Sequence, residues 1–232
     1  MTNSTSERKF VVEGLIPANA ITVFAGTPKV GKTSGMASLA HSLANGTEFM
    51  GLKTEKQHCH FLASEGKDEA NLKFIACNEN VASGDGQCMF YDKIFSINSD
   101  EGRGFLKYLL MLNVAENDRA PITIMIDNVM LFMEYSDSEN YDYQVTMQTL
   151  RQLLKEYPEA TFVVSDHSQR DGMPNVELVA NADVVYTLTK KDSNLTITPS
   201  VTRFKMPPAY IVDLNIWDSG SHGTIQYVNY QK

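Results

Sequence analysis

The stretch from Ala25 to Gly35, Ala-Gly-Thr-Pro-Lys-Val-Gly-Lys-Thr-Ser-Gly, decides the fold, because it joins a short apolar run to a segment of helical periodicity. It contains the G-x-x-x-x-G-K-T pattern of a phosphate-binding loop. In such a loop, backbone N–H groups face the phosphates and the N-terminus of the following helix adds its positive dipole end. The nucleotide-binding residues predicted from this pattern are Gly26, Thr27, Pro28, Lys29, Val30, Gly31, Lys32, Thr33 and Ser34.

The two last polar residues of the pattern have separate expected roles. We expect the Lys32 ammonium to neutralise the β- and γ-phosphates of a nucleoside triphosphate, and the Thr33 hydroxyl to bind Mg²⁺. Among the triphosphates we expect ATP.

Apolar runs of strand length alternate with helical segments along most of the chain. Strands are expected at 20–25, 58–63, 89–97, 122–127 and 161–166. Between and after them, apolar residues at helical spacing mark four helix faces: Met36, Leu39, Ala40 and Leu43; Leu72, Ile75 and Ala76; Phe105, Leu109 and Leu112; and Met147, Leu150 and Leu154. This rhythm predicts an α/β fold with a mostly parallel sheet flanked by helices. Four later apolar segments, 184–188, 195–201, 209–216 and 224–230, are expected to extend the same sheet as antiparallel strands.

The composition of the 232 residues is that of a globular protein, with 43% hydrophobic and 21% charged residues. We expect a single domain over 1–232, with 1–9 as a disordered tail. No apolar run is long enough to span a membrane, and we expect a cytoplasmic protein whose three cysteines are reduced thiols. The net charge of −8 excludes nucleic-acid binding by the overall electrostatic field.

Carboxylates follow two of the predicted strands. Asp127 closes the strand Ile-Thr-Ile-Met-Ile-Asp and is the expected Mg²⁺ partner, although an Asp in this place also caps turns. Because the next residue is Asn128, the general base has to come from elsewhere. Glu65, after the strand 58–63, is the candidate, and its alternative role is that of an acid capping the next helix.

A histidine follows the strand 161–166. His167 would lie at the carboxyl edge of the sheet, where ligands of open α/β sheets bind, and could donate a hydrogen bond to the γ-phosphate, with Asp166 orienting it. The alternative is an ordinary loop histidine. His58 and His60 share one face of a strand, and we interpret them as packing or surface residues, because further metal ligands cannot be placed.

The order of these motifs resembles the RecA-like ATPases of the RepA and DnaB helicase group. The resemblance runs through Val12-Glu-Gly-Leu-Ile-Pro up to the phosphate loop, His-Phe-Leu-Ala-Ser-Glu-Gly, Ile-Met-Ile-Asp-Asn-Val and Val-Val-Ser-Asp-His-Ser-Gln, and ends near Leu214. It implies Lys32 and Thr33 as nucleotide and Mg²⁺ ligands, Glu65 as base, Asp127 as Mg²⁺ partner and His167 as γ-phosphate sensor. It also implies the RepA-type form, without the extra N-terminal domain of full-length DnaB-type helicases.

The same resemblance implies a ring, expected to be a hexamer, with nucleotide between identical subunits. Family members place a Lys and an Arg on a late strand that reaches the neighbouring subunit's phosphates. The matching stretch here is Val-Thr-Arg-Phe-Lys-Met-Pro-Pro, so Arg203 and Lys205 stand in the reverse order, and the pattern does not decide which of them is the finger. A solvated basic pair on an edge strand is the alternative.

The two loops expected to face the ring channel are poor in basic residues. The first contains Glu134, Asp137, Glu139 and Asp142, and the second offers Arg170 alone as a cation. Three hypotheses follow: a phage or plasmid replicative helicase acting on single-stranded DNA, a recombination mediator that binds single strands without unwinding, and a nucleotide switch that acts on a protein partner.

Overall fold

The computed structural model describes residues 8–63, 68, 70–71, 88–92, 95–133, 142–167, 174–192, 194–203, 210–217 and 224–231, with backbone only at 194, 210–217 and 224–231. Within these ranges the strands are β1 (Phe10–Val12), β2 (Ile16–Pro17), β3 (Ile21–Gly26), β4 (His58–Ala63), β5 (Cys88–Tyr91), β6 (Ile122–Asp127), β7 (Ala160–His167), β8 (Val184–Lys191), β9 (Asn194–Thr202), β10 (Tyr210–Trp217) and β11 (Thr224–Gln231). The helices are α1 (Lys32–Asn45), α3 (Asp100–Glu116), α4 (Tyr143–Glu156), α5 (Val176–Asn181) and the short 3-10 helix η1 (Val129–Phe132).

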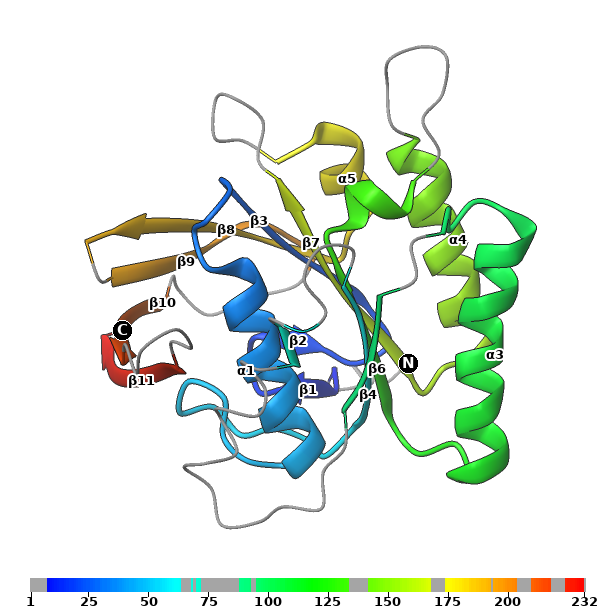
Figure 1. Cartoon of the computed structure of the whole chain (residues 1–232), viewed down its shortest axis with the longest axis horizontal. Coiled ribbons are helices and arrows are strands. Elements are labelled where there is room, and N and C mark those ends of the chain that lie inside the picture. Colours follow the sequence, from blue (N-terminus) through cyan, green and yellow to red (C-terminus); the bar gives the residue numbers. More distant parts are fainter. Residues whose placement is uncertain are drawn as a thin grey trace, which may run out of the picture.

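One nine-stranded sheet organises the molecule, in the order β11-β10-β9-β8-β3-β7-β6-β4-β5 (Figure 1). The six strands from β8 to β5 are parallel, and β9, β10 and β11 continue the sheet as antiparallel strands. The expected fold class is therefore confirmed. Strand β3, which leads into the phosphate loop, lies between β7 and β8, so its carboxyl end is flanked by parallel strands on both sides.

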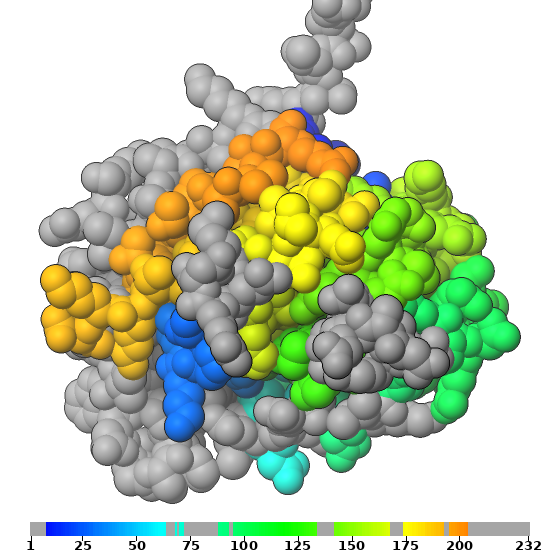
Figure 2. Space-filling view, turned by 90° about the horizontal axis from the view of Figure 1, so that it is seen from above, coloured from blue at the N-terminus to red at the C-terminus, as the bar shows by residue number. Residues whose placement is uncertain are grey.

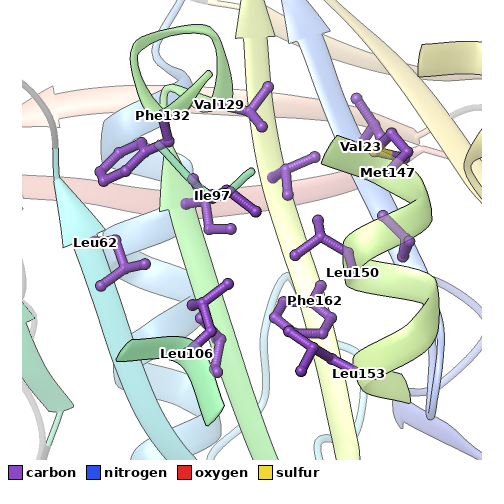
Figure 3. Packing of buried hydrophobic residues seen from close by; sticks show 14 of the residues in the cluster. Val23, Leu62, Ile97, Leu106, Val129, Phe132, Met147, Leu150, Leu153 and Phe162 are labelled. Atoms are coloured by element: carbon purple, nitrogen blue, oxygen red, sulfur yellow. The ribbon is translucent and has the colours of Figure 1, made fainter. Parts of the chain in front are cut away.

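Helices cover both faces of the parallel part of the sheet (Figure 1). On one face, Met36, Leu39 and Leu43 of α1 pack with β1, β2 and the residues of the sheet that point toward them. On the other face, α3 and α4 supply buried leucines to a second core (Figure 3). Residues of alternate parity on each central strand belong to alternate cores, as the side-chain period of a strand requires.

The ends of α1 follow from its sequence. Gly46 adopts a left-handed conformation (φ 68°) and its N–H donates to the carbonyl of Leu43, which ends the helix as Asn45-Gly46 predicts. At the other end, Gly31 (φ 107°) turns the chain into the helix. Other expected elements match as well, including the strands at 58–63, 122–127 and 161–166 and the helix carrying Met147 and Leu150.

Several expectations about elements were wrong in detail. The segment 184–188 lies in β8, which pairs parallel to β3 and is not the first antiparallel strand. It can do so because the short helix α5 crosses over between β7 and β8, and six residues are too few to show helical periodicity in the sequence. Strand β5 ends at Tyr91, although 89–97 was expected to be one strand. Phe95 and Ile97 are buried against α3 and η1 from a loop instead.

Smaller differences concern α3 and the N-terminus. The buried face of α3 is formed by Leu106, Leu109 and Leu110, while Phe105 and Leu112 are half-buried. Strands β1 and β2 were not foreseen, and the carbonyl of Lys9, a residue assigned to a disordered tail, accepts a hydrogen bond from the N–H of Ala18. The helix expected after Asp68 lies largely outside the described residues. No helix in the described part of the chain has the length and apolar character needed to cross a membrane.

Candidate nucleotide site

The phosphate loop lies at the carboxyl edge of the sheet, between the ends of β7 and β8. Gly26 pairs with His167 on one side and with Leu188 on the other. A Cβ on Gly26 would lie 2.8 Å from the carbonyl oxygen of Leu188 and 2.9 Å from Val30, so glycine is required for the close approach of these strands. Figure 2 looks onto this edge and shows the loop, in blue, at the surface of the molecule.

The N-terminus of α1 differs from the other helix starts that the structure describes. The helices α3, α4 and α5 are capped by the side chains of Ser99, Asp142 and Asn175, whereas the N-cap of α1 is Gly31 and no side chain caps this helix. The first N–H groups of a helix have no partner within the helix. At α1 no side-chain cap competes for these groups, which is the arrangement that an anion-binding loop requires.

Lys32 lies at the centre of the site. Its Nζ donates to the carbonyl oxygens of Gly26 (2.7 Å) and Thr27 (3.0 Å) and lies 3.2 Å from Nδ1 of His167. Because a lysine ammonium has donors only, Nδ1 of His167 is the acceptor, and the neutral ring carries its proton on Nε2. Burial lowers the pKa of Lys32, and the charges of Asp127 and Asp166 act in the opposite direction.

Asp127 is the last residue of β6 and lies on the α1 face of the sheet. The hydroxyl of Ser165, on the neighbouring strand β7, donates to Oδ1 of Asp127. The turn after β6 is capped by a different residue, because the side chain of Asn128 accepts the N–H of Met130 at 2.9 Å. The peptide bond between Asp127 and Asn128 is cis. Asp127 and Thr33 together offer the hard oxygen ligands that Mg²⁺ prefers.

The polar residues at the end of β7 point alternately to the two faces of the sheet. Val163 belongs to the α1 core and Phe162 and Val164 to the α3–α4 core, so Ser165 and His167 lie on the α1 face and Asp166 on the α4 face. Asp166 is fully buried, and the hydroxyl of Tyr143 donates to its Oδ1 at 3.1 Å. Burial raises the pKa of Asp166 to about 6, although Tyr143, the backbone of His167 and Lys32 all lower it.

The structure thus brings together at one edge Lys32, Asp127 and His167, the residues proposed as phosphate ligand, metal partner and sensor. It also shows two contacts that sequence reasoning missed, Ser165 with Asp127 and Tyr143 with Asp166. A signal for the first was present, because Ser165 stands two residues before His167 and therefore shares its strand face. Glu65 and Arg170 lie outside the described residues.

Arg203 is not part of this edge in its own chain. Strand β9 ends at Thr202, which pairs with Val184 at the amino end of β8, whereas the phosphate loop is at the carboxyl end. Arg203 therefore follows the strand and is not on it. Its side chain is exposed, and Nη2 donates to the carbonyl of Ala180 at 2.8 Å. Lys205 lies outside the described residues.

The two histidines of β4 have no metal-binding surroundings within the part of the chain that the structure describes. Nδ1 of His60 lies 2.9 Å from the hydroxyl of Tyr91, and burial lowers the pKa of His60 to about 4, while His58 is exposed. No cluster of three or more His, Cys, Asp or Glu that could hold a metal is found within the described ranges. The packing interpretation of His60 agrees with this geometry.

Comparison with known proteins identifies the fold and the family of the chain. Two solved structures are similar: one is described as an ATPase domain (TM-score 0.63, 13% identity, 91% of this chain and 85% of that chain), and the other is the KaiC-like protein PH0186 from the hyperthermophilic archaeon Pyrococcus horikoshii OT3 (TM-score 0.56, 16% identity, 93% of each chain). A search of curated proteins finds no match. The model of the AAA domain family matches residues 1–173. The chain therefore belongs to the AAA domain family, and it is a P-loop ATPase with the RecA-like fold.

Proposed function

We propose that this ATPase is a motor that acts on single-stranded DNA, as a RepA-type replicative helicase of a phage or plasmid. The observation that carries the proposal is the contact between Lys32 and His167 at the carboxyl edge. A histidine sensor beside the phosphate loop, with Asp127 followed by Asn128 and with a glutamate after β4, is the combination on which the resemblance to the helicase group depends. The likeness to the solved ATPase domain agrees with the proposal at the level of the fold.

Each residue of the site has a separate proposed role in hydrolysis. The N–H groups of the phosphate loop and Lys32 bind the phosphates. Thr33 and Asp127 would hold Mg²⁺, which when bound neutralises charge on the phosphate oxygens. Glu65 is the proposed base that takes the proton of the attacking water. His167, whose Nδ1 contacts Lys32 beside the phosphate loop, is the proposed hydrogen-bond donor to the γ-phosphate.

The proposed assembly is a ring, expected to be a hexamer, with each nucleotide between two copies of the chain. The position of Arg203 supports a shared site, because this cation is exposed at the amino end of β8, away from the phosphate loop of its own chain. A cation there is far from the phosphate loop of its own chain, so any contact with a phosphate would have to be made in a neighbouring subunit. Lys205, two residues further on, is the second proposed cation of this kind.

Charge favours a second candidate, a nucleotide switch that acts on a protein partner. The chain has a net charge of −8, and the segment between β6 and α4 contains four acidic residues and no basic one. One of them, Asp142, caps α4 by accepting the N–H of Val145 at 2.9 Å and so has a structural role. Phosphate contacts normally come from Lys, Arg or backbone amides, of which Arg170 is the side-chain candidate in the second loop.

The deciding experiment measures ATPase rate with and without single-stranded DNA. On the proposed function, DNA raises turnover, oligonucleotide binding in the presence of ATP weakens with salt, and a forked duplex is unwound. Binding without unwinding would indicate the recombination mediator. An Arg170→Ala variant should weaken DNA binding and keep the basal ATPase rate. If the ATPase rate of the wild-type protein does not change when DNA is added, and DNA binding is undetectable, the protein-directed switch is favoured.

A further inference from the structure

Asp166 is a carboxylic acid on a face of β7 whose other side chains, Phe162 and Val164, belong to the apolar core. It pairs with Ala25 of β3, directly before the start of the phosphate loop, and its side chain points into the α3–α4 core beside Val164. It is fully buried, and its Oδ2 has no hydrogen-bond partner among the described residues. Burying a carboxylate with one oxygen unpaired is unfavourable, so a residue in this position is a candidate for function.

Two parts of the molecule meet at this carboxyl group. From the α4 side, the hydroxyl of Tyr143, the first residue of that helix, donates to Oδ1 at 3.1 Å. From the nucleotide side, the charge of Lys32 interacts with Asp166, and the backbone of His167 hydrogen-bonds to it. Lys32 and His167 are themselves in contact at 3.2 Å. Tyr143, Asp166, His167 and Lys32 therefore form a continuous chain of contacts that passes from one face of the sheet to the other.

The negative charges of Asp166 and Asp127 act in the same direction on Lys32. Both carboxylates raise the pKa of Lys32 against the effect of burial. Asp127, however, is the proposed partner of Mg²⁺, so its charge is shared with the metal. Asp166 lies on the opposite face of the sheet, where it can act on Lys32 without contacting a metal on the α1 face.

We propose that Asp166 is a positioning residue for ATP hydrolysis. Tyr143 fixes its carboxylate from the α4 side, and the carboxylate in turn fixes the ammonium of Lys32 and the backbone of His167 against the phosphate loop. The role concerns the ATPase reaction alone and is independent of whether the partner is DNA or protein. A displacement of about 1 Å in such groups can reduce a catalysed rate by about 10²-fold.

The test measures kcat and KM for ATP in the full chain at saturating Mg²⁺. Asp166→Asn keeps the size of the side chain and an acceptor for Tyr143 but removes the charge, and Tyr143→Phe removes the hydroxyl alone. We expect kcat to fall about 10-fold to 100-fold in Asp166→Asn and about 3-fold to 10-fold in Tyr143→Phe. KM should change less than kcat in both, because the loop N–H groups that bind the phosphates are unchanged and Lys32 itself is kept.

A double variant tests whether Tyr143 acts through Asp166. If it does, Tyr143→Phe in the Asp166→Asn background lowers kcat no further, since contacting residues of one pathway are not additive. The matched control is Tyr186→Phe, which removes another buried tyrosine hydroxyl, bonded to the carbonyl of Leu15 at 2.7 Å on the α1 side. It should leave kcat unchanged.

Wild-type kcat in both single variants, with a change confined to the thermal midpoint, would overturn the proposal. So would multiplicative effects in the double variant, or an equal loss of kcat in Tyr186→Phe. Circular dichroism verifies that each variant is folded. If Asp166→Asn does not fold, Tyr143→Phe carries the test with Tyr186→Phe as its reference, and a wild-type kcat in Tyr143→Phe then refutes the proposal.

Discussion

Lys32 and His167 are in direct contact, with Nζ of the lysine 3.2 Å from Nδ1 of the histidine and bonded also to the carbonyl oxygens of Gly26 and Thr27. A bound triphosphate would compete for the same three ammonium hydrogens. Transfer of Lys32 to the phosphates would release Nδ1 of His167, so the ring is placed where it can respond to the presence of nucleotide. The contact joins the phosphate loop to the end of β7.

The first prediction is that Lys32→Ala abolishes nucleotide binding or hydrolysis, because the triphosphate loses its main neutralising charge. Binding of a fluorescent ATP analogue and release of phosphate measure the two steps. Lys155→Ala, which removes an exposed lysine from the last turn of α4, is the matched control and should behave as wild type. Undiminished turnover in Lys32→Ala would refute the assignment of the phosphate loop.

The second prediction concerns the contact between Ser165 and Asp127. Ser165→Ala removes the hydroxyl that orients Asp127, and outer partners of metal ligands typically contribute about 10-fold to 100-fold in metal affinity. We expect the Mg²⁺ concentration for half-maximal ATPase to rise about 10-fold, with a near-normal rate at saturating Mg²⁺. Ser200→Ala, which removes an exposed hydroxyl in contact with Thr187, is the control. An unchanged Mg²⁺ titration would show that Asp127 needs no such support.

The third prediction is a pH dependence of stability. Burial raises the pKa of Asp166 from 3.8 to about 6, so between about pH 4 and pH 6 the folded protein keeps a proton that the unfolded chain has released. Stability therefore falls as pH rises through this window and is constant above it. The shift of about 2 units corresponds to roughly 3 kcal/mol. We expect Asp166→Asn to be more stable than wild type at pH 7, by up to this amount, and to lose the advantage at pH 4.

Urea unfolding of both proteins at the two pH values measures this difference. His60, whose pKa is lowered to about 4, titrates in the same range but is present in both proteins, so its contribution cancels. Greater stability combined with a lower kcat would mark Asp166 as a residue kept for activity. Lower stability of Asp166→Asn at pH 7 would mean that the attraction between Asp166 and Lys32 outweighs the cost of burial.

The position of the predicted phosphate loop at the carboxyl edge of the sheet could be foreseen, because it depends on short-range patterns. The spacing from Gly26 to Thr33 and the apolar strands ending in Asp127 and Asp166 each occupy fewer than ten residues, and the parallel sheet aligns their ends. The order of the strands and the position of β8 depend on the crossover through α5, which is too short to show periodicity.

Contacts between distant segments could not be predicted. Tyr143 and Asp166 are 23 positions apart, and Ser165 and Asp127 are 38 apart. Neither pair has a characteristic spacing, since each contact depends on strand parity and on how α4 packs against β7. The position of Arg203 could not be predicted either, because it depends on the register of β9 against β8 and not on the local sequence pattern.

The fourth prediction concerns Glu65. In Glu65→Gln we expect ATP binding to persist and turnover to fall by at least about 10²-fold, the usual effect of removing a general base. Single-turnover phosphate release separates the chemical step from nucleotide binding. If Glu65 is a helix-capping acid, the variant instead loses about 1 kcal/mol of stability and keeps a near-normal rate.

The fifth prediction is that hydrolysis requires a second copy of the chain. In the transition state, charge spreads over the γ-phosphate oxygens, and a further cation there is worth about 10³-fold or more in rate. Arg203 cannot supply it within its own chain, because Thr202 pairs with Val184, four residues before Leu188, and strands rise about 3.3 Å per residue. Turnover per subunit should therefore increase with protein concentration, and the double variant Arg203→Ala, Lys205→Ala should bind ATP but scarcely hydrolyse it.

Mixing variants distinguishes a shared site from a folding defect. Subunits carrying Glu65→Gln lack the base but keep Arg203 and Lys205, and the double variant keeps Glu65 but lacks both cations. A mixture should regain activity where an intact Glu65 faces an intact pair of cations on the neighbour. Lys53→Ala, Lys155→Ala, which also removes two exposed cations, is the control and should be active alone. A fully active monomer, or no recovery at any mixing ratio, would contradict the shared site, because cations that act within their own chain cannot be supplied by another.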